Sequence, residues 1–339
     1  MNADIKHPTT LTEAVRYFSD PETSLHFFAS IRWPDGVRCP QCGSEKVSYL
    51  ANQRRWQCHT KHPRRQFSAK VGTIFEDSAL PLEQWMVAVW LEVNAKNSIS
   101  SYELHRALGV TQKTAWFMLH RVRLALQNGS LVKFGGPGGP AVEVDETYIG
   151  GLARNMHKNR RDKVITSTGG VDKTPVMGLL ERHSGGKCSQ VRTKVLENRR
   201  SRSLHEVIHK NIEPGSQVFT DEHHGYAGLD PAFVHAVINH AQQYVDGIVH
   251  TNGLENFWAL FKRCIKGTHV SVEPFHLFRY LDSECFRFNN RKVKDGDRFR
   301  MALGGATGKR LTYRALIGQD NPEGAQQSGN DEGNADFTS

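Results

Sequence analysis

The chain has 339 residues, with 44 Lys or Arg against 35 Asp or Glu, so its formal net charge is +9. That length suggests two or three domains with ample material for apolar cores. No apolar run approaches the ~20 residues that span a bilayer, and the first residues lack the apolar segment of a secretory signal. Six cysteines, unevenly placed, do not make a disulfide scaffold. We expect a cytoplasmic protein without a membrane partner, and its basic balance makes a polyanion the first partner to consider.

The charge is distributed unevenly along the chain. The last 22 residues hold five acids and no Lys or Arg, and they are rich in Gly, Asn, Gln and Ser, a composition typical of a disordered acidic tail. Two other segments, 52–70 and 154–163, are strongly basic. A charged run is usually a solvated face, so neither segment alone predicts DNA binding. The basic residues that we expect to contact DNA are Arg54, Arg55, Arg64, Arg65, Arg154, Lys158, Arg160 and Arg161.

A zinc-binding pattern lies inside the first basic segment. Cys39 and Cys42 form a CxxC motif, Cys58 follows 16 positions later, and His62 comes four positions after that. Ligand pairs about 15–20 residues apart are typical of a zinc ribbon, whose ion supplies on the order of 10 kcal/mol of folding free energy. The second half is Cys-x3-His instead of CxxC, and His59 competes as the fourth ligand. A pair of redox or buried thiols is the alternative, but it would not need Cys58, His62 and the basic neighbours. We predict structural zinc, with His62 as the fourth ligand.

A helical region follows the ribbon. Residues 81–93 read as a helix, Ser100 and Glu103 form a capping box for a second, and 111–126 has the apolar spacing of a third. The turn between the second and third contains Gly109, so the pair is typical of a helix-turn-helix whose later helix enters a DNA groove. An ordinary helical hairpin in a larger core is the alternative. The side chains that we expect to point outward to phosphates or bases are Gln112, Lys113 and His120.

A Gly/Pro linker at 135–140 separates this region from a different kind of sequence. The pattern predicts three strands, a helix, a strand, another strand and a final helix, which is an α/β layer with mixed strand pairing. The predicted strands are 141–149, 174–180, 189–195, 216–220 and 233–238, and the predicted helices are 203–212 and 252–266.

Three acidic residues of this layer lie at predicted strand ends or at the start of a predicted helix. We place Asp145 and Asp221 at the carboxyl ends of strands, and Glu255 begins the last helix. Strand ends on one edge of an open α/β sheet commonly form a site. Three carboxylates together repel one another and therefore favour Mg2+ or Mn2+, and a pair of such ions can catalyse chemistry at phosphorus. Lys262 lies two helical turns after Glu255, where it can contact a DNA phosphate.

Each of these acids also has an ordinary explanation. Glu143 and Glu146 flank Asp145 as decoys, and a single acid at a strand end is more often a turn former or a helix cap. Asn252 and Glu255 have the spacing of a capping box, which would explain both without catalysis. Spacing alone is therefore consistent with a metal-dependent phosphoryl transferase and does not establish one.

The motifs in combination resemble those of a known family. CPQC…C…H, QFSAKVGTIFEDS, VEVDETYIGG, VFTDEHHGY and HTNGLENFWALFKRCIKG, in this order over roughly residues 15–300, resemble a bacterial insertion-sequence transposase of the ISXO-two-like group. The resemblance implies a zinc ribbon before a ribonuclease-H-like catalytic domain, and a DDE-type reaction that cuts and joins double-stranded DNA. It implies Asp145 and Asp221 as metal ligands with Mg2+ or Mn2+. The third position is Glu or Asn in this group; we favour Glu255, because a carboxylate binds Mg2+ better, and keep Asn252 as the alternative.

We divide the chain accordingly into an N-terminal segment with the ribbon (1–72), a helix-turn-helix region (73–134), a ribonuclease-H-like catalytic domain (135–300) and a C-terminal extension (301–339). Transposases of this kind hold two DNA ends, so we expect a homo-oligomer on DNA and association with the nucleoid. Two other functions fit the same motifs. One is a DNA-binding regulator whose catalytic domain has decayed, and the other is a nuclease of the same fold that cuts without joining.

Overall fold

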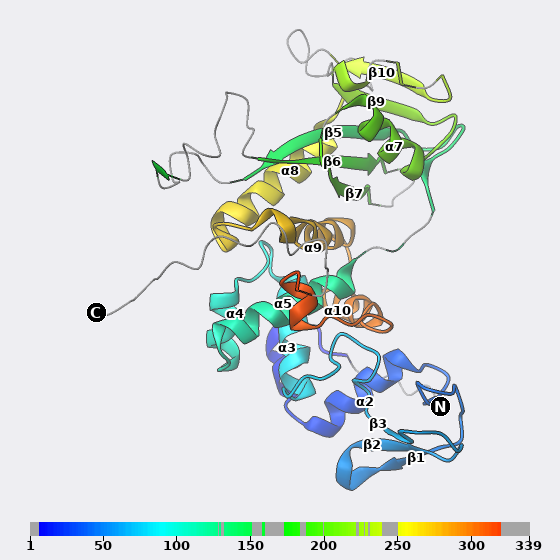
Figure 1. Ribbon diagram of the computed structural model, residues 1–339, viewed down its shortest axis with the longest axis vertical. Coiled ribbons are helices and arrows are strands. Elements are labelled where there is room, and N and C mark those ends of the chain that lie inside the picture. Colours follow the sequence, from blue (N-terminus) through cyan, green and yellow to red (C-terminus); the bar gives the residue numbers. More distant parts are fainter. Residues whose placement is uncertain are drawn as a thin grey trace.

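The computed structural model describes residues 7–127, 129, 132–150, 158–159, 173–183, 188–198, 200–221, 224–226, 228–229, 231–238 and 250–319. Within these ranges the chain forms a small antiparallel sheet, a helical unit and a larger mixed sheet with helices on both faces (Figure 1). The expected acidic tail, apart from its first two residues, lies outside the described residues. Among the described helices none is both long and apolar enough to cross a membrane.

The N-terminal part begins with two capped helices, α1 (Leu11–Tyr17) and α2 (Pro21–Arg32), whose first turns are closed by the side chains of Thr10 and Asp20. An antiparallel sheet follows, with Trp56 of its middle strand packed on Phe67 and Trp33. Its elements are β1 (Val47–Leu50), the short helix η1 (Ala51–Gln53), β2 (Arg55–Cys58) and β3 (Gln66–Phe67).

The three helices predicted for the next region are present. They are α3 (Leu82–Asn94), α4 (Ser101–Leu108) and α5 (Gln112–Leu126). The predicted capping box of Ser100 and Glu103 is confirmed. Gly109 ends α4 in the left-handed region at φ 68°, a conformation that favours glycine.

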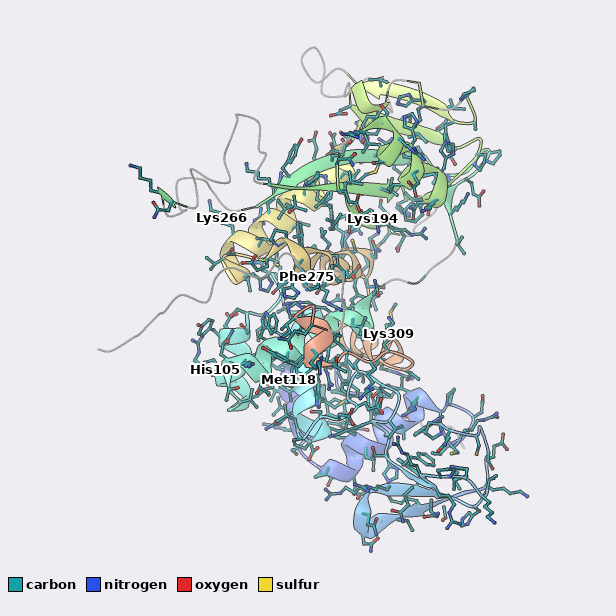
Figure 2. The ribbon with its side chains drawn as sticks, in the orientation of Figure 1. His105, Met118, Lys194, Lys266, Phe275 and Lys309 are labelled. Atoms are coloured by element: carbon teal, nitrogen blue, oxygen red, sulfur yellow. The ribbon has the colours of Figure 1, made fainter. Side chains whose placement is uncertain are left out.

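Residues near the end of the described chain complete this helical unit. Helix α10 (Asp295–Gly304) packs on α3, and its Phe299 joins the same core as Phe18, Phe27 and Trp90. After α10, Lys309 donates hydrogen bonds to the carbonyl oxygens of Leu124, Ala125 and Gln127, where a cation neutralises the C-terminal end of α5 (Figure 2). The last described helix is α11 (Tyr313–Leu316).

The larger sheet has five strands in the order β10-β9-β5-β6-β7. β5, β6 and β7 form an antiparallel meander, whereas β9 runs parallel to both β5 and β10. All five predicted strands are thus confirmed to within one residue at either end. Their bounds are β5 (Val142–Ile149), β6 (Thr174–Glu181), β7 (Gln190–Val195), β9 (Gln217–Asp221) and β10 (Val234–Ile238). A separate parallel pair joins β4 (Phe134–Gly135) to β8 (Ile212–Glu213).

Two apolar layers cover the faces of this sheet. On one face Val142 and Val144 of β5 pack with Leu204 and Ile208 of α7 (Ser201–Asn211). The other face packs against α8 (Asn252–Cys264) and α9 (Leu277–Asn289). The π-helical turn η4 (Ile265–His269) continues α8, and η5 (Pro274–His276) precedes α9. A third short element, η3 (His224–Tyr226), lies between β9 and β10 and packs on α7.

Helix α9 lies between the sheet and α5, so it joins the helical unit to the sheet domain (Figure 1). A fully buried ion network crosses this interface. Arg123 of α5 donates to Glu92 of α3 at 2.9 Å, and Ser283 of α9 donates to the same carboxylate at 2.8 Å. Arg287 of α9 donates to the Glu92 carbonyl oxygen at 3.3 Å.

This packing corrects one prediction about α5. His120, expected to face outward, is 0% exposed and lies against the rings of Trp116 and His276, at centroid distances of 4.5 and 4.9 Å. The cause is that α5 is a central helix, packed by α3, α9 and α10, so only its first turns reach the surface. The arrangement is a pair of helices with a glycine turn, and most of the later helix is unavailable to a DNA groove.

Candidate metal centres and DNA-contacting residues

Two predicted site residues, Asp145 and Asp221, lie where the neighbouring strands β5 and β9 separate. Parallel pairing between β5 and β9 ends at Glu143 and Phe219, and two residues further along each strand come Asp145 and Asp221. Asp221 ends β9 as predicted. Asp145 does not end a strand: it is the fourth residue of β5, which continues to Ile149 as the antiparallel partner of β6. The two aspartates therefore meet where two parallel neighbours separate, which is the place where α/β sheets commonly form a site.

A third acid, Glu146, joins this group. Ligand oxygens of Asp145, Glu146 and Asp221 all lie within 4.8 Å of one another. Glu146 belongs to the α7 face of β5, where the buried Tyr226 lies beside its carboxylate. We expected Glu146 to be a neighbour of Asp145 without a role in the site. Side chains alternate along a strand, so Glu146 is expected on the face of the sheet opposite to Asp145. The separation of β5 from β9 lets both faces contribute to one acidic cluster.

The electrostatics of the cluster fit a divalent cation. Burial and the charges of Asp221 and Glu146 raise the pKa of Asp145 to about 7. Burial and Glu146 likewise raise the pKa of Tyr226 well above its usual value. A carboxylate group with so much uncompensated negative charge is stabilised by Mg2+ or Mn2+, whose preferred ligands are oxygens. The donor set and its charge therefore fit such an ion.

Helix α8 is anchored beside this cluster by Glu143. The Glu143 side chain is 1% exposed and accepts hydrogen bonds from the backbone N–H of Leu254 at 3.0 Å and from Arg182 Nε at 2.8 Å. A carboxylate from the sheet thus caps the positive end of the helix. The N-cap residue itself is Thr251, without a side-chain cap bond, so the capping box suggested for Asn252 and Glu255 is not formed.

Asn252 and Glu255, the two alternatives for the third ligand, are both exposed on the first turns of α8. Glu255 does not belong to the acidic cluster of the described residues. Trp258, one turn after Glu255, donates its indole N–H to Asp145 Oδ2 at 3.1 Å. At about 1.5 Å of rise per residue, Glu255 lies roughly 4.5 Å along the helix from Trp258 and Asn252 roughly 9 Å. Lys262, also exposed, continues the stripe of Glu255 and Trp258.

The N-terminal cluster has the geometry of a zinc site. The ligand atoms of Cys39, Cys42, Cys58 and His62 lie within 4.8 Å of one another. Cys42 Sγ and Cys58 Sγ are 3.7 Å apart, and a tetrahedral site with Zn–S of about 2.3 Å has an edge of about 3.8 Å. His62 Nε2 lies 3.4 Å from Cys39 Sγ, and its Nδ1 is 2.6 Å from the Pro63 carbonyl oxygen. That contact fixes the tautomer which leaves Nε2 free for a metal.

His59, the competing ligand, is turned away from these cysteines. Its Nε2 lies 3.0 Å from Ser48 Oγ of β1, and His59 is the residue that directly follows β2. The four clustered side chains thus fit Zn2+ as a structural ion without His59.

The basic residues expected at DNA are placed as follows. Arg55, Arg64 and Arg65 are exposed on the small sheet, whereas Arg54 pairs with Glu22 of α2 at 3.1 Å. Lys158 is exposed, and Arg154, Arg160 and Arg161 lie outside the described residues.

Of the two residues at the start of α5 that we expected at DNA, one is exposed and the other is bonded to α4. Lys113 is exposed, with its ammonium 4.6 Å from the centre of the Tyr313 ring. Gln112 donates to Ser101 Oγ of α4 at 2.8 Å, which ties the two helices together.

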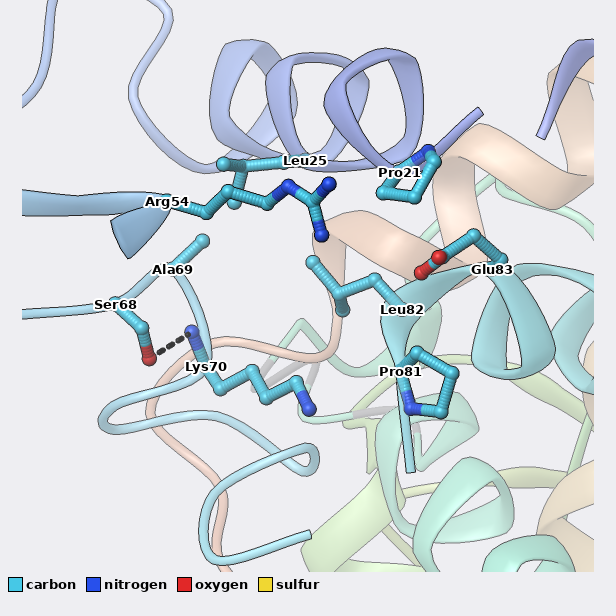
Figure 3. Close-up of a pocket in the computed structure, with 9 residues that line it drawn as sticks. All are labelled: Pro21, Leu25, Arg54, Ser68, Ala69, Lys70, Pro81, Leu82 and Glu83. Carbon is cyan, nitrogen blue, oxygen red and sulfur yellow. Dashed lines mark hydrogen bonds between the residues drawn. The ribbon is translucent and has the colours of Figure 1, made fainter. Parts of the chain in front are cut away.

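A pocket of about 160 Å3 lies between the small sheet and the helices α2 and α3 (Figure 3). Two cations line it, but both are already engaged. Lys70 Nζ donates to the carbonyl oxygens of Ser78 and Leu80, and Arg54 holds Glu22. This pocket therefore lies where the small sheet packs against α2 and α3. Lys70 and Arg54 already have partners there and are not offered to a phosphate.

Comparison with known proteins agrees with this architecture. Residues 137–289 match the family model of the ISXO2-like transposase domain, and residues 19–60 match that of the transposase zinc-ribbon domain. The chain is 29% identical over 277 residues to an uncharacterized protein in transposable element ISH50 of Halobacterium salinarum, which covers 79% of this chain and 90% of the relative.

The two family models occur in the order that the motifs predicted, and their ranges contain the zinc-ligand cysteines and the carboxylate cluster respectively. The chain thus carries, in this order, a segment that matches a transposase zinc ribbon and a segment that matches the ISXO2-like transposase domain, and over most of its length it is similar to a protein of a transposable element.

Proposed function

We propose that this protein is a DDE-type DNA transposase that binds the ends of its element, cleaves phosphodiesters to expose 3′-hydroxyls, and joins those hydroxyls to target DNA. The observation that carries the proposal is the meeting of Asp145 and Asp221 at the opening between β5 and β9, inside a domain that matches a transposase family. The order of strands, a three-stranded antiparallel meander followed by two parallel strands beside its first strand, supports a ribonuclease-H-like catalytic domain.

Asp145 and Asp221 would hold the catalytic Mg2+ or Mn2+, which when bound lowers the pKa of an attacking water and stabilises charge on the leaving oxygen. We propose Glu255 as the third ligand, because it is closer along α8 to the residue that touches Asp145 than Asn252 is. Lys262, farther along the same stripe, would hold a phosphate of the DNA backbone.

The N-terminal parts would hold the DNA. Zn2+ bound by Cys39, Cys42, Cys58 and His62 would fix the ribbon, whose exposed arginines then contact the phosphate backbone. Phosphate contacts position a protein without reading sequence, so binding should weaken with salt. Because two ends must be held together, we propose a homo-oligomer on DNA.

The test compares wild type with Asp221→Ala on a duplex carrying the terminal repeat that flanks the gene, with Mg2+ present, and reads binding and cleavage separately. We expect both proteins to bind and only the wild type to cut. A wild type that binds and never cuts with Mg2+ or Mn2+ would favour a DNA-binding regulator. Transfer of a labelled, pre-cut end into a plasmid then separates a transposase from a nuclease of the same fold, which yields no joined product.

The third ligand can be assigned with two matched variants on the same helix. Glu255→Gln should abolish cleavage while Asn252→Ala retains it, with DNA binding unchanged in both. Loss of cleavage only in Asn252→Ala would transfer the role to Asn252.

A further inference from the structure

Trp258 is the one large aromatic residue of α8 that reaches the carboxylates. Its indole is 4% exposed and is packed in the apolar layer between α8 and the sheet. Within that layer its N–H points at Asp145 and donates to Oδ2 at 3.1 Å. An indole has a single donor and no acceptor, so this bond sets where that donor is directed.

The neighbouring strand β6 has a glycine where the indole of Trp258 packs. Gly178 of β6 is the direct register partner of Asp145. A Cβ atom at Gly178 would lie 2.6 Å from Trp258 Cζ2 and 2.8 Å from Leu254 Cδ2, closer than packed carbon atoms approach. Residue 178 must therefore lack a side chain for the indole to pack at this position and reach Asp145.

The two ends of this contact belong to different parts of the proposed site. Asp145 comes from the central strand, and Trp258 lies one turn from Glu255 on α8. The start of α8 is already fixed to the same strand through Glu143 and Leu254. The bond from Trp258 is thus a second attachment between β5 and α8, at the level of the carboxylates themselves.

We propose that Trp258 is a positioning residue of the metal site: its indole N–H orients the Asp145 carboxylate and holds α8 at the distance from which Glu255 completes the ligand set. This inference rests on the proposed function. Hydrogen-bonded partners of metal-ligating carboxylates commonly contribute 10–100-fold to metal affinity.

The principal variant is Trp258→Phe, which removes the N–H and keeps a ring over Gly178. Trp90→Phe is the matched control, because Trp90 is 2% exposed in the helical-unit core, away from the carboxylates. Mn2+ binding to full-length protein, followed by electron paramagnetic resonance, should weaken about tenfold in Trp258→Phe and remain unchanged in Trp90→Phe. Thermal midpoints of the two variants should fall by similar amounts. Mn2+ affinity in Trp258→Phe equal to that of the wild type would overturn the inference.

A second measurement leaves Trp258 in place. The chain has six tryptophans, so indole 15N labelling gives a small set of resonances. In Asp145→Asn one indole N–H resonance should shift, because its acceptor changes from a carboxylate to an amide. No shift among the six would show that the bond is not formed, and would overturn the inference without any variant at Trp258.

The proposed function fails in a different way. If wild type neither cleaves DNA nor loses Mn2+ binding on Asp221→Ala, the carboxylates are not a metal site at all. If wild type cuts and binds Mn2+ through Asp221 while Trp258→Phe matches it, only the role of Trp258 is refuted.

Discussion

Asp145→Asn should stabilise the protein in the absence of divalent cations. Burial and the neighbouring acids raise the pKa of the folded Asp145 to about 7, against 3.8 for the carboxyl in an unfolded chain. Between these two pH values the Asp145 carboxyl is ionised in the unfolded chain but still protonated in the folded chain. The free energy of unfolding of the wild type therefore falls as the pH rises from about 4 to about 7, and it does not change further above that range. The difference of about 3 pH units, at about 1.4 kcal/mol each, gives a loss of up to about 4 kcal/mol.

Asparagine has no charge to lose, so Asp145→Asn escapes this penalty. We expect the variant to exceed the wild type by up to about 4 kcal/mol at pH 8, which corresponds to on the order of 10 °C in the unfolding midpoint of the sheet domain. At pH 5 the advantage should fall below half of that value. Calorimetry measures the stability difference at both pH values. The buffers are prepared without Mg2+ and contain no chelator, so that the protein keeps its zinc. Adding Mg2+ at pH 8 should stabilise the wild type and leave the variant nearly unchanged.

Asp282→Asn is the matched control. Burial raises the pKa of Asp282 to about 6, and Asp282 lies on α9, outside the acidic cluster. Its variant should show the same kind of pH-dependent gain with no change in the response to Mg2+. A wild type at least as stable as Asp145→Asn at pH 8 without cations would refute the view that Asp145 carries uncompensated charge.

Three further predictions concern other parts of the chain. Cys58→Ser should abolish stoichiometric zinc, measured by elemental analysis, and expose the ribbon to proteolysis, whereas His59→Ala should retain the metal. Glu92→Gln removes the charge that pairs buried Arg123, so it should lower the free energy of unfolding by about 3–5 kcal/mol in urea titrations; a change below 1 kcal/mol would contradict that pairing. Replacing Arg64 and Arg65 together by Gln should reduce the salt dependence of DNA binding by about 2 in log–log slope, and an unchanged slope would place the DNA elsewhere.

Local patterns in the sequence predicted the elements well. Alternation and turn residues located the five strands, and the capping box of Ser100 and Glu103 located α4, because each of these signals acts within a few residues. The CxxC with Cys58 and His62 predicted the cluster, since the ligand spacing on a short hairpin leaves few alternatives.

Features that depend on tertiary packing were missed. His120 has the spacing of an exposed face on α5 taken alone, and only the return of α9 buries it. Glu146 looked like a decoy, because the separation of β5 from β9 cannot be read from either strand. Glu143 and Trp258 act across more than 100 residues of sequence, and the only local sign of the latter contact is Gly178 within an otherwise apolar strand.

The contribution of α10 and α11 to the helical unit has a consequence for synthesis. Phe299 and three residues that follow it, up to Ala306, close a core that begins at Ala14, and an isolated bridge between Thr73 and Thr307 joins the two stretches directly. On the ribosome the early helices emerge long before their last partners, so the helical unit, whose core also includes residues of the ribbon that we propose contacts DNA, is finished only after the whole sheet domain has been made. A prematurely terminated chain would lack that closure. We therefore expect truncated products to compete poorly for the ends of the element, which would couple occupancy of those ends to possession of the carboxylates.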